Sequence, residues 1–222
     1  MGIIDVNAVT YVYRNKWQQT IAVNNVTFEF ERGKMYTIVG KSGSGKTTFL
    51  SMLAGLDVPT DGEVLFDGRS TKKLDRDLYR RDDVSVVYQN YNLFPLMTVL
   101  ENVSYPLELY GQPVKDARAK AKRMIEEVGL TDAVYKRYPA MLSGGEQQRV
   151  AIARALCSNA RVILADEPTG NLDTENSKKV IDILQKLAHE NRYCVIIVTH
   201  DLSIADRADV ILHMKDGRLC HE

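Results

Sequence analysis

Residues 40–47 have the types and spacing that bind a phosphate group. They read Gly-Lys-Ser-Gly-Ser-Gly-Lys-Thr and fit the pattern Gly-x-x-x-x-Gly-Lys-Ser/Thr. The glycines let the backbone turn sharply with its N–H groups inward, and a helix from Thr48 onward would direct its N-terminus at the phosphates. We expect Lys46 to reach the β- and γ-phosphates of a nucleotide and the Thr47 hydroxyl to ligate the accompanying Mg²⁺. The residues expected to contact the nucleotide here are Gly40, Ser42, Gly43, Ser44, Gly45, Lys46, Thr47 and Thr48.

A second stretch, residues 142–149, also has the features of an anion site. It reads Leu-Ser-Gly-Gly-Glu-Gln-Gln-Arg and precedes the apolar run 150–156, which places Ser143 and the two glycines at a helix N-terminus. Ser143 also caps this helix, with Glu146 completing a capping box, and that role is compatible with anion binding. A chain that already has one phosphate loop needs no other. We therefore infer that the second site serves a nucleotide held by a different copy of the protein.

Polar side chains lie at the ends of three apolar runs of strand type. The runs span residues 84–88, 161–167 and 193–199, and the side chains at their ends are Gln89, Asp166, Glu167 and His200. Ligands of open α/β sheets bind at the carboxyl ends of parallel strands, so we expect these side chains beside the phosphate loop. Asp166 and Glu167 point to opposite faces, and one orients Mg²⁺ through water while the other meets the nucleophilic water. Gln89 contacts Mg²⁺ or that water, and His200 bonds to the γ-phosphate.

The residues ahead of the phosphate loop predict a small β layer. Residues 3–13 and 25–31 are rich in Val, Ile, Thr, Phe and Tyr, and they precede the strand at 35–39 that leads into the loop. Tyr13 belongs to this layer and is followed by a polar loop that contains Trp17. The Tyr13 ring either stacks on an adenine or packs as an ordinary tyrosine at a strand end, and the pattern alone favours the second.

Helical patterns follow the strand at 84–88. Apolar residues recur at spacings of four, four and three within residues 117–128, which predicts an amphipathic helix that stops at Gly129. Residues 71–83 carry charges of both signs and predict a solvated helix face. Residues 91–103 are unusually apolar for a segment that leaves a sheet. They form either a buried helix start or a groove that receives a partner.

Composition excludes several classes of protein. The chain has 222 residues, and its 29 Lys and Arg equal its 29 Asp and Glu, so no global basic field indicates nucleic acid. No apolar run approaches the roughly 18 residues of a membrane span, and we expect a cytoplasmic protein with one core. Cys157, Cys194 and Cys220 lack the spacing of a metal site, which predicts buried thiols in a reducing compartment.

Taken in order, these motifs resemble the ATPase subunit of ATP-binding cassette (ABC) transporters, over essentially all 222 residues. The corresponding positions are an aromatic (Tyr13), the Walker A loop (40–47), the Q-loop (Gln89), the signature (142–148), the Walker B strand (162–166) with Glu167, the D-loop (171–173) and the switch histidine (His200). The signature is the most specific, because a Walker A loop alone leaves kinases and GTPases open. Residues 88–94 and 164–173 are most similar to the branch of MacB, lipoprotein-releasing systems and antimicrobial-peptide exporters.

The resemblance implies an α/β fold. Its parts are a P-loop NTPase (RecA-like) core with a mostly parallel sheet, an N-terminal antiparallel β layer and an inserted α-helical subdomain. Residues 1–222 then form a single ATPase domain. Within it, residues 1–89 and 160–222 make the β layer and the nucleotide-binding core, and residues 90–159 make the helical subdomain that carries the signature.

The resemblance also implies a head-to-tail homodimer that encloses two ATP, each between one copy's Walker A loop and the other copy's signature. It adds to the nucleotide contacts Tyr13, Ser143, Gly144, Gly145, Glu146 and Asp173. Glu167 then polarises the attacking water, His200 holds the γ-phosphate, and Lys46 offsets developing charge. The catalytic set is Glu167, His200, Lys46 and Gln89, and the implied Mg²⁺ ligands are Thr47, Gln89 and Asp166.

The implied partner is an integral-membrane permease on another chain, which docks near Tyr91, Leu93, Phe94 and Met97 and holds the ATPase at the inner face of the cell membrane. Two other functions explain the sequence less well. Soluble ABC ATPases that act on nucleic acid or the ribosome usually carry coiled coils, zinc modules or two cassettes, and this sequence has none of these. A P-loop kinase leaves the signature unexplained. We therefore expect no nucleic-acid partner.

Overall fold

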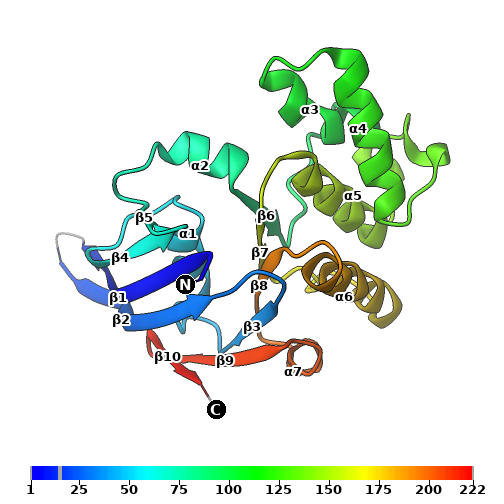
Figure 1. Cartoon of the computed structure of the whole chain (residues 1–222). Coiled ribbons are helices and arrows are strands. Elements are labelled where there is room, and N and C mark those ends of the chain that lie inside the picture. The colour runs from blue at the N-terminus through cyan, green and yellow to red at the C-terminus, as the bar shows by residue number, and fades with distance from the viewer. Residues whose placement is uncertain (1, 15–16, 222) are drawn as a thin grey trace.

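A six-stranded sheet runs through the computed structural model, which describes residues 2–14 and 17–221 (Figure 1). Its strand order is β10-β9-β3-β8-β7-β6, and the neighbours from β9 to β6 are parallel, while β10 is antiparallel to β9. The strands are β3 (Met35–Val39), β6 (Val84–Tyr88), β7 (Val162–Asp166), β8 (Cys194–Thr199), β9 (Val210–Lys215) and β10 (Arg218–His221). The predicted mostly parallel sheet is confirmed.

A second, antiparallel sheet of order β2-β1-β4-β5 flanks it. Its strands are β1 (Ile4–Arg14), β2 (Gln19–Phe30), β4 (Asp61–Phe66) and β5 (Arg69–Ser70). The predicted β layer is therefore confirmed, but the expected strand at 25–31 begins earlier, at Gln19. The polar residues at its start join the strand because they pair with β1, for example Thr20 with Tyr13.

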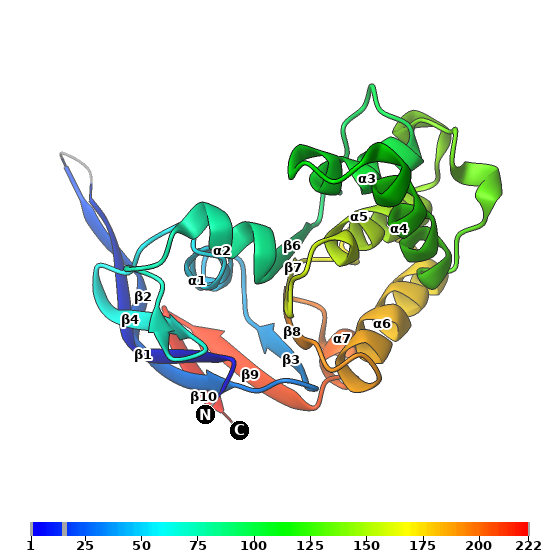
Figure 2. The same ribbon diagram turned by 45° about the horizontal axis from the view of Figure 1, so that its top comes forward.

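Three helices pack on one another at one end of the molecule, away from the antiparallel sheet (Figures 1 and 2). They are α3 (Val99–Leu109), α4 (Val114–Glu127) and α5 (Gly144–Cys157). The amphipathic pattern of α4 was predicted correctly, because Ala117, Ala121 and Ile125 are all buried. Two short 3-10 turns, Asp132–Val134 and Pro139–Met141, connect α4 to α5.

The other helices lie against the sheets. They are α1 (Lys46–Leu53), α2 (Arg76–Asp82), α6 (Thr174–His189) and α7 (Leu202–Ala205). Helix α1 begins at Lys46 rather than at the expected Thr48, because Gly45 is its N-cap. Only the second half of the charged stretch 71–83 is helical, since Asp75 caps α2 by accepting the N–H groups of Asp77 and Leu78.

Both faces of the parallel sheet are buried, which explains the continuous apolar strands. Tyr36 and Ile38 of β3 face a core that includes Phe49 of α1 and the antiparallel sheet. Met35 of β3 and Val195 of β8 face the other core, which includes residues of α3 to α6. Because both sides of the strands are held, their carboxyl ends form a rigid edge. Within the described ranges, no helix has the length and apolar character needed to cross a membrane.

Candidate functional site

The phosphate loop follows β3 and packs closely between two other strands, β9 and β2. A Cβ atom on Gly40 would lie 2.4 Å from the Met214 carbonyl oxygen, and one on Gly45 would lie 2.2 Å from the Ala22 carbonyl oxygen. Gly45 also has φ 105°, a left-handed conformation that favours glycine. Gly43 needs glycine for its φ of 77° alone, because nothing lies within 4 Å of its Cβ position. The loop is therefore tightly fixed on its inner side, where Gly40 and Gly45 pack against neighbouring strands, and open on its outer side, at Gly43.

The inner side of the loop has polar groups of the kind that bind an anion. Gly45 gives α1 no side-chain cap, and the first turn of the helix has no acidic residue. The buried Ser44 hydroxyl has no hydrogen-bond partner in the described structure. Lys46 is nearly buried, and its Nζ donates to the carbonyl oxygens of Gly40 at 2.6 Å and Lys41 at 3.1 Å. This ammonium group and the free helix N-terminus both favour phosphate.

A cleft of about 800 Å³ opens over this loop and brings the predicted strand-end side chains together. Its walls include residues 20–22 of β2 and the loop residues 41–43 and 45–48, whereas the predicted contacts Gly40 and Ser44 lie behind the lining. The side chains that complete it are Tyr13, Gln89, Asp166, Glu167 and His200. The parallel strands β6, β7 and β8 end side by side, so Gln89, the two acids and His200 reach one place although they are far apart in sequence.

Tyr13 forms the wall of the cleft beside the start of α1. Its hydroxyl lies 3.2 Å from Thr48 Oγ1, and half of its surface is exposed. Tyr11, its edge-on neighbour, instead donates its hydroxyl to Asp57 at 3.4 Å. The prediction from sequence missed Ile21, which is 55% exposed and lines the same cleft. Thr20 pairs with Tyr13 across the hairpin. The strand that pairs with Tyr13 was therefore the signal that could have indicated Ile21.

Asp166 and Thr47 face each other across the floor of the cleft. Thr47 Oγ1 donates to Asp166 Oδ1 at 3.4 Å. Burial raises the pKa of Asp166 above its ordinary value, and the nearby charge of Glu167 adds to this. The described ranges contain no group of three or more His, Cys, Asp or Glu side chains able to hold a metal. A hydroxyl, a carboxylate and the Gln89 amide suit Mg²⁺, which prefers oxygen ligands and is usually completed by water and phosphate oxygens.

Glu167 is held in an unusual backbone conformation with its carboxylate fixed at both oxygens. Its φ is 47°, in the left-handed region, and its N–H donates to the Val198 carbonyl at 2.9 Å. Thr199 Oγ1 donates to Oε2 at 3.0 Å, and His200 Nδ1 lies 3.0 Å from Oε1. These contacts aim the carboxylate at a defined point beside the phosphate loop. Thr199 was not predicted from sequence, because a threonine inside a buried strand has no distinguishing pattern.

Gln89 is linked to the D-loop. Its Nε2 donates to Asn171 Oδ1 at 3.3 Å, and Asn171 Nδ2 donates back to the Gln89 carbonyl at 3.2 Å. A Cβ on Gly170 would lie only 2.7 Å from Gln89 Nε2, so Gly170 leaves room for this amide. The end of β6 and the segment after β7 are thereby joined at the edge of the cleft.

The second anion site lies at the start of α5. Ser143 and Glu146 form the predicted capping box: Ser143 N–H donates to Glu146 Oε2 at 2.8 Å, and Glu146 N–H donates to Ser143 Oγ at 3.3 Å. The first of these bonds lowers the pKa of the Glu146 carboxyl. Gly144 and Gly145 face other parts of the chain, since their Cβ positions lie 2.9 Å from the Tyr91 hydroxyl and 2.3 Å from Asn176 Oδ1.

The two anion sites are separate within one copy of the chain. Among the described residues that line the cleft, none belongs to the stretch 142–149. Asp173 also lies outside the cleft lining. It caps α6 by accepting the Asn176 N–H at 2.8 Å, and this hydrogen bond lowers the pKa of the Asp173 carboxyl. The structure thus brings the first group of predicted residues together and leaves Ser143 to Glu146 and Asp173 elsewhere.

Comparison with known proteins gives matches over nearly the whole chain. Residues 23–170 match the family model described as ABC transporter. The uncharacterized ABC transporter ATP-binding protein YclH of Bacillus subtilis (strain 168) is 43% identical over 217 residues, which is 98% of this chain and 95% of YclH.

Two solved structures extend this likeness. The ATP-binding cassette MJ0796, in a dimeric post-hydrolysis state bound to ADP and Pi, is 39% identical with a TM-score of 0.89, covering 97% of this chain and 96% of that one. The structure of cbiO1 from Clostridium perfringens, part of the ABC transporter complex cbiONQ, is 27% identical with a TM-score of 0.88, covering 99% and 87%.

Proposed function

Because the chain belongs to the ATP-binding subunits of the ABC transporter family, all of which are ATPases, we propose that it works as a head-to-tail homodimer. Two copies enclose two ATP, and each nucleotide lies between one copy's phosphate loop and the other copy's signature. The dimer drives a separate permease in the membrane. The ADP-bound MJ0796 relative, which is dimeric, supports this assembly.

The separation of the two anion sites carries this proposal. Lys46 and the start of α1 line the cleft, whereas Ser143 and the start of α5 do not, although both helix starts have the features that bind phosphate. A nucleotide held by one copy leaves its outer side open at Gly43. The partner subunit's Ser143, Gly144, Gly145 and Glu146 close that side in the proposed dimer, and the partner's Asp173 approaches from the same direction.

The contacts of the cleft define the chemistry of the proposed site. The Tyr13 ring packs on the adenine, and the loop N–H groups and Lys46 hold the β- and γ-phosphates. Thr47, Asp166 and Gln89 would hold Mg²⁺, which when bound offsets negative charge on the phosphates. Lys46, already inside the loop, offsets the charge that develops on the transferred group.

Hydrolysis in the proposed site needs one base. The water oxygen bonds to the γ-phosphorus, the bond from that phosphorus to the bridging oxygen breaks, and ADP leaves with the electron pair. Glu167 accepts the proton of the water, because Thr199 and His200 fix its carboxylate beside the loop. His200 also bonds to the γ-phosphate, and Gln89 orients the water. Positioning and electrostatics of this kind supply most of the catalysis in phosphoryl transfer.

The permease docks on residues 91–98 in this proposal. Phe94 is 44% exposed and Leu96 is 89% exposed, whereas Leu93 packs partly against the core. Tyr91, Leu93, Phe94 and Met97 form the proposed contact surface. Exposed apolar clusters tend to mark partner sites, and docking of the permease here would hold the ATPase at the inner face of the cell membrane.

The helices α3, α4 and α5 form a separate unit in the proposal. Residues 90–159 make this helical subdomain, and residues 1–89 and 160–222 make the core. The mutual packing of the three helices supports the division.

The motif stretches 88–94 and 164–173 further favour the branch that contains MacB, lipoprotein-releasing systems and antimicrobial-peptide exporters.

Glu167→Gln tests the proposal in the isolated subunit. An amide cannot accept the proton of the water, so this variant should bind ATP as the wild type does and hydrolyse it at least about 100-fold more slowly. ATP should then accumulate in a dimer, which light scattering detects as a doubled mass. The same variant without nucleotide serves as the control and should stay monomeric. Near wild-type turnover, together with a monomer in ATP, would contradict the proposal.

A further inference from the structure

The loop after Gln89, residues 91–98, begins with two strained residues. Tyr91 has φ 59° and Asn92 has φ 48°, and both lie in the left-handed region. Such a conformation is unfavourable for a residue other than glycine, more so for tyrosine than for asparagine, and it persists where the surroundings impose it. Some part of the fold must therefore hold the start of this loop.

Arg154, on the helix that begins with the signature, supplies that hold. Its Nη1 donates to the Asn92 carbonyl at 2.7 Å, and its Nη2 donates to the Tyr91 carbonyl at 3.0 Å. Its guanidinium carbon lies 6.0 Å from the centre of the Phe94 ring. No carboxylate in the described part of the chain is ion-paired with Arg154, so these carbonyls are the main acceptors for a partly buried charge. A planar fork with two parallel donors suits two successive carbonyls in a way that an ammonium does not.

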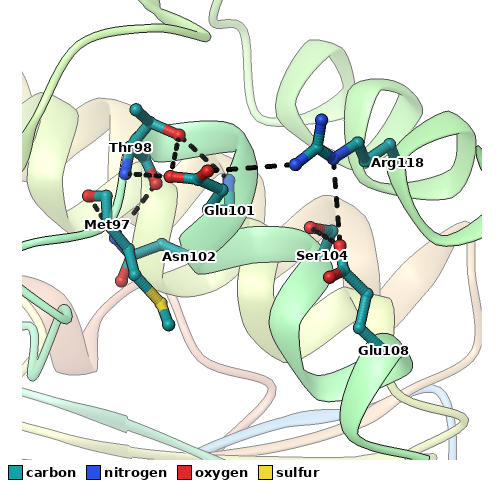
Figure 3. Close-up of polar contacts among 7 residues, drawn as sticks. All are labelled: Met97, Thr98, Glu101, Asn102, Ser104, Glu108 and Arg118. Atoms are coloured by element: carbon teal, nitrogen blue, oxygen red, sulfur yellow. Dashed lines mark hydrogen bonds and ion pairs between the residues drawn. The ribbon is translucent and has the colours of Figure 1, made fainter. Parts of the chain in front are cut away.

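The far end of the loop is held by Asn102 of α3, which is completely buried. Its Oδ1 accepts the Phe94 N–H at 2.7 Å, and its Nδ2 donates to the carbonyls of Phe94, Met97 and Thr98 at 2.9 to 3.1 Å. Figure 3 shows Asn102 beneath Met97 and Thr98 at the start of α3. The exposed tip of the loop, with Phe94 and Leu96, is therefore a preformed surface.

The two residues before the loop, Gln89 and Asn90, are held by a different part of the chain, and Asn90 Oδ1 accepts from Asn171 Nδ2 at 3.3 Å. Gln89 bonds to Asn171 of the D-loop, as described above, and not to any residue of α3 or α5 in the described structure. The boundary between the two supports therefore lies at Asn90, where the backbone turns. Residues up to Asn90 belong with the sheet edge. From Tyr91 onward the carbonyls are held by Arg154 of the signature helix, although the Tyr91 N–H still donates to the Tyr88 carbonyl of β6 at 3.2 Å.

We propose that Arg154 is a positioning residue that ties residues 91–98 to the signature helix. The inference rests on the proposed function, because Arg154 would transmit a displacement of the docking surface to Ser143 at the start of the same helix. The loop and the signature helix then move together when a partner binds the exposed tip or when the signature contacts a nucleotide. Because such coupling is reciprocal, nucleotide binding at the signature must also alter the loop.

Amide hydrogen exchange of the isolated subunit tests the clamp, with Arg154→Gln as the main variant. Without nucleotide, peptides covering residues 91–98 should exchange at least about tenfold faster than in the wild type, whereas residues 144–157 should be unchanged. Arg154→Lys keeps the charge without the fork and should behave like Arg154→Gln. Arg123→Gln, at an exposed arginine of α4, is the matched control and should change nothing. Unchanged exchange of the loop in both Arg154 variants would overturn the proposal.

The coupling is tested in the Glu167→Gln background, where ATP traps the dimer. ATP should slow the exchange of residues 91–98 when Arg154 is present and leave it unaltered in the double variant with Arg154→Gln, although both proteins dimerise. A loop that still responds to ATP without Arg154 would contradict the inference. Failure of Glu167→Gln to dimerise would instead count against the proposed function, and the nucleotide-free comparison would still decide the clamp. If Arg154→Gln melts early, Arg154→Lys decides.

Discussion

Replacing Phe94 by aspartate should remove permease docking while leaving the ATPase folded. Phe94 is 44% exposed, so its side chain is a little more than half buried. Full burial of a phenylalanine contributes about 1.5–3 kcal/mol, and losing half of that costs about 1–2 kcal/mol. The edge-on contact with Tyr105, with ring centroids 5.2 Å apart, adds about 0.5–1.5 kcal/mol. The Asn102 bonds involve only the backbone of Phe94 and remain.

The sum, about 1.5–3.5 kcal/mol, should lower the Tm of a chain of this size by about 3–14 °C. Basal hydrolysis by the isolated Phe94→Asp subunit should stay within about threefold of the wild type, and co-purification with the permease should be lost. Phe66→Asp, the same change at a completely buried phenylalanine, is the control and should prevent folding. Phe94→Ser adds no charge beside Arg154 and should give the same loss of docking. A fall in Tm beyond about 15 °C, or a normal assembly with the permease, would refute the reasoning.

The nucleotide site supports two further predictions. Burial raises the folded pKa of Asp166 above its unfolded value, so its charge opposes folding at neutral pH, and this cost disappears as pH falls through the folded pKa. Asp166→Asn should therefore raise the Tm at about pH 7 without nucleotide, by an amount that shrinks toward about pH 4, while abolishing Mg²⁺-dependent turnover. A Tm lowered at neutral pH would contradict this. Gly45→Ala should abolish nucleotide binding in a fluorescence titration and destabilise the fold, because its Cβ would meet the Ala22 carbonyl. Gly43→Ala, with open space around its Cβ, should destabilise the fold less than Gly45→Ala does. Equal destabilisation by the two variants would show that steric contact at the Cβ position does not determine the loss of stability.

The sequence predicted the parts of the site that depend on strand order and local pattern. Gln89 and His200 each follow an apolar strand and Asp166 ends one, and the carboxyl ends of parallel strands necessarily meet at one edge. The capping box of Ser143 and Glu146 was likewise predicted, because it depends on a spacing of three residues.

The parts that were missed depend on partners distant in sequence. The first residues of β2 look like a polar loop, and only their pairing with β1 makes them a strand that carries Ile21 into the cleft. Thr199 gains its role from the left-handed backbone of Glu167, which no local pattern announces. Arg154 bonds to carbonyls more than sixty positions away, and backbone acceptors leave no trace in composition.

The most direct test of the shared site mixes two inactive variants. Lys46→Ala should weaken nucleotide binding itself, whereas Ser143→Arg should leave binding by the monomer intact and abolish turnover, because the two residues serve different nucleotides. In a mixed dimer, one site carries both changes and the other carries neither. An equal mixture should therefore recover at most about a quarter of wild-type hydrolysis, since half of the dimers are mixed and each has one intact site. Recovery of hydrolysis is the predicted result, and no recovery in a mixture proven to contain mixed dimers would contradict the shared site.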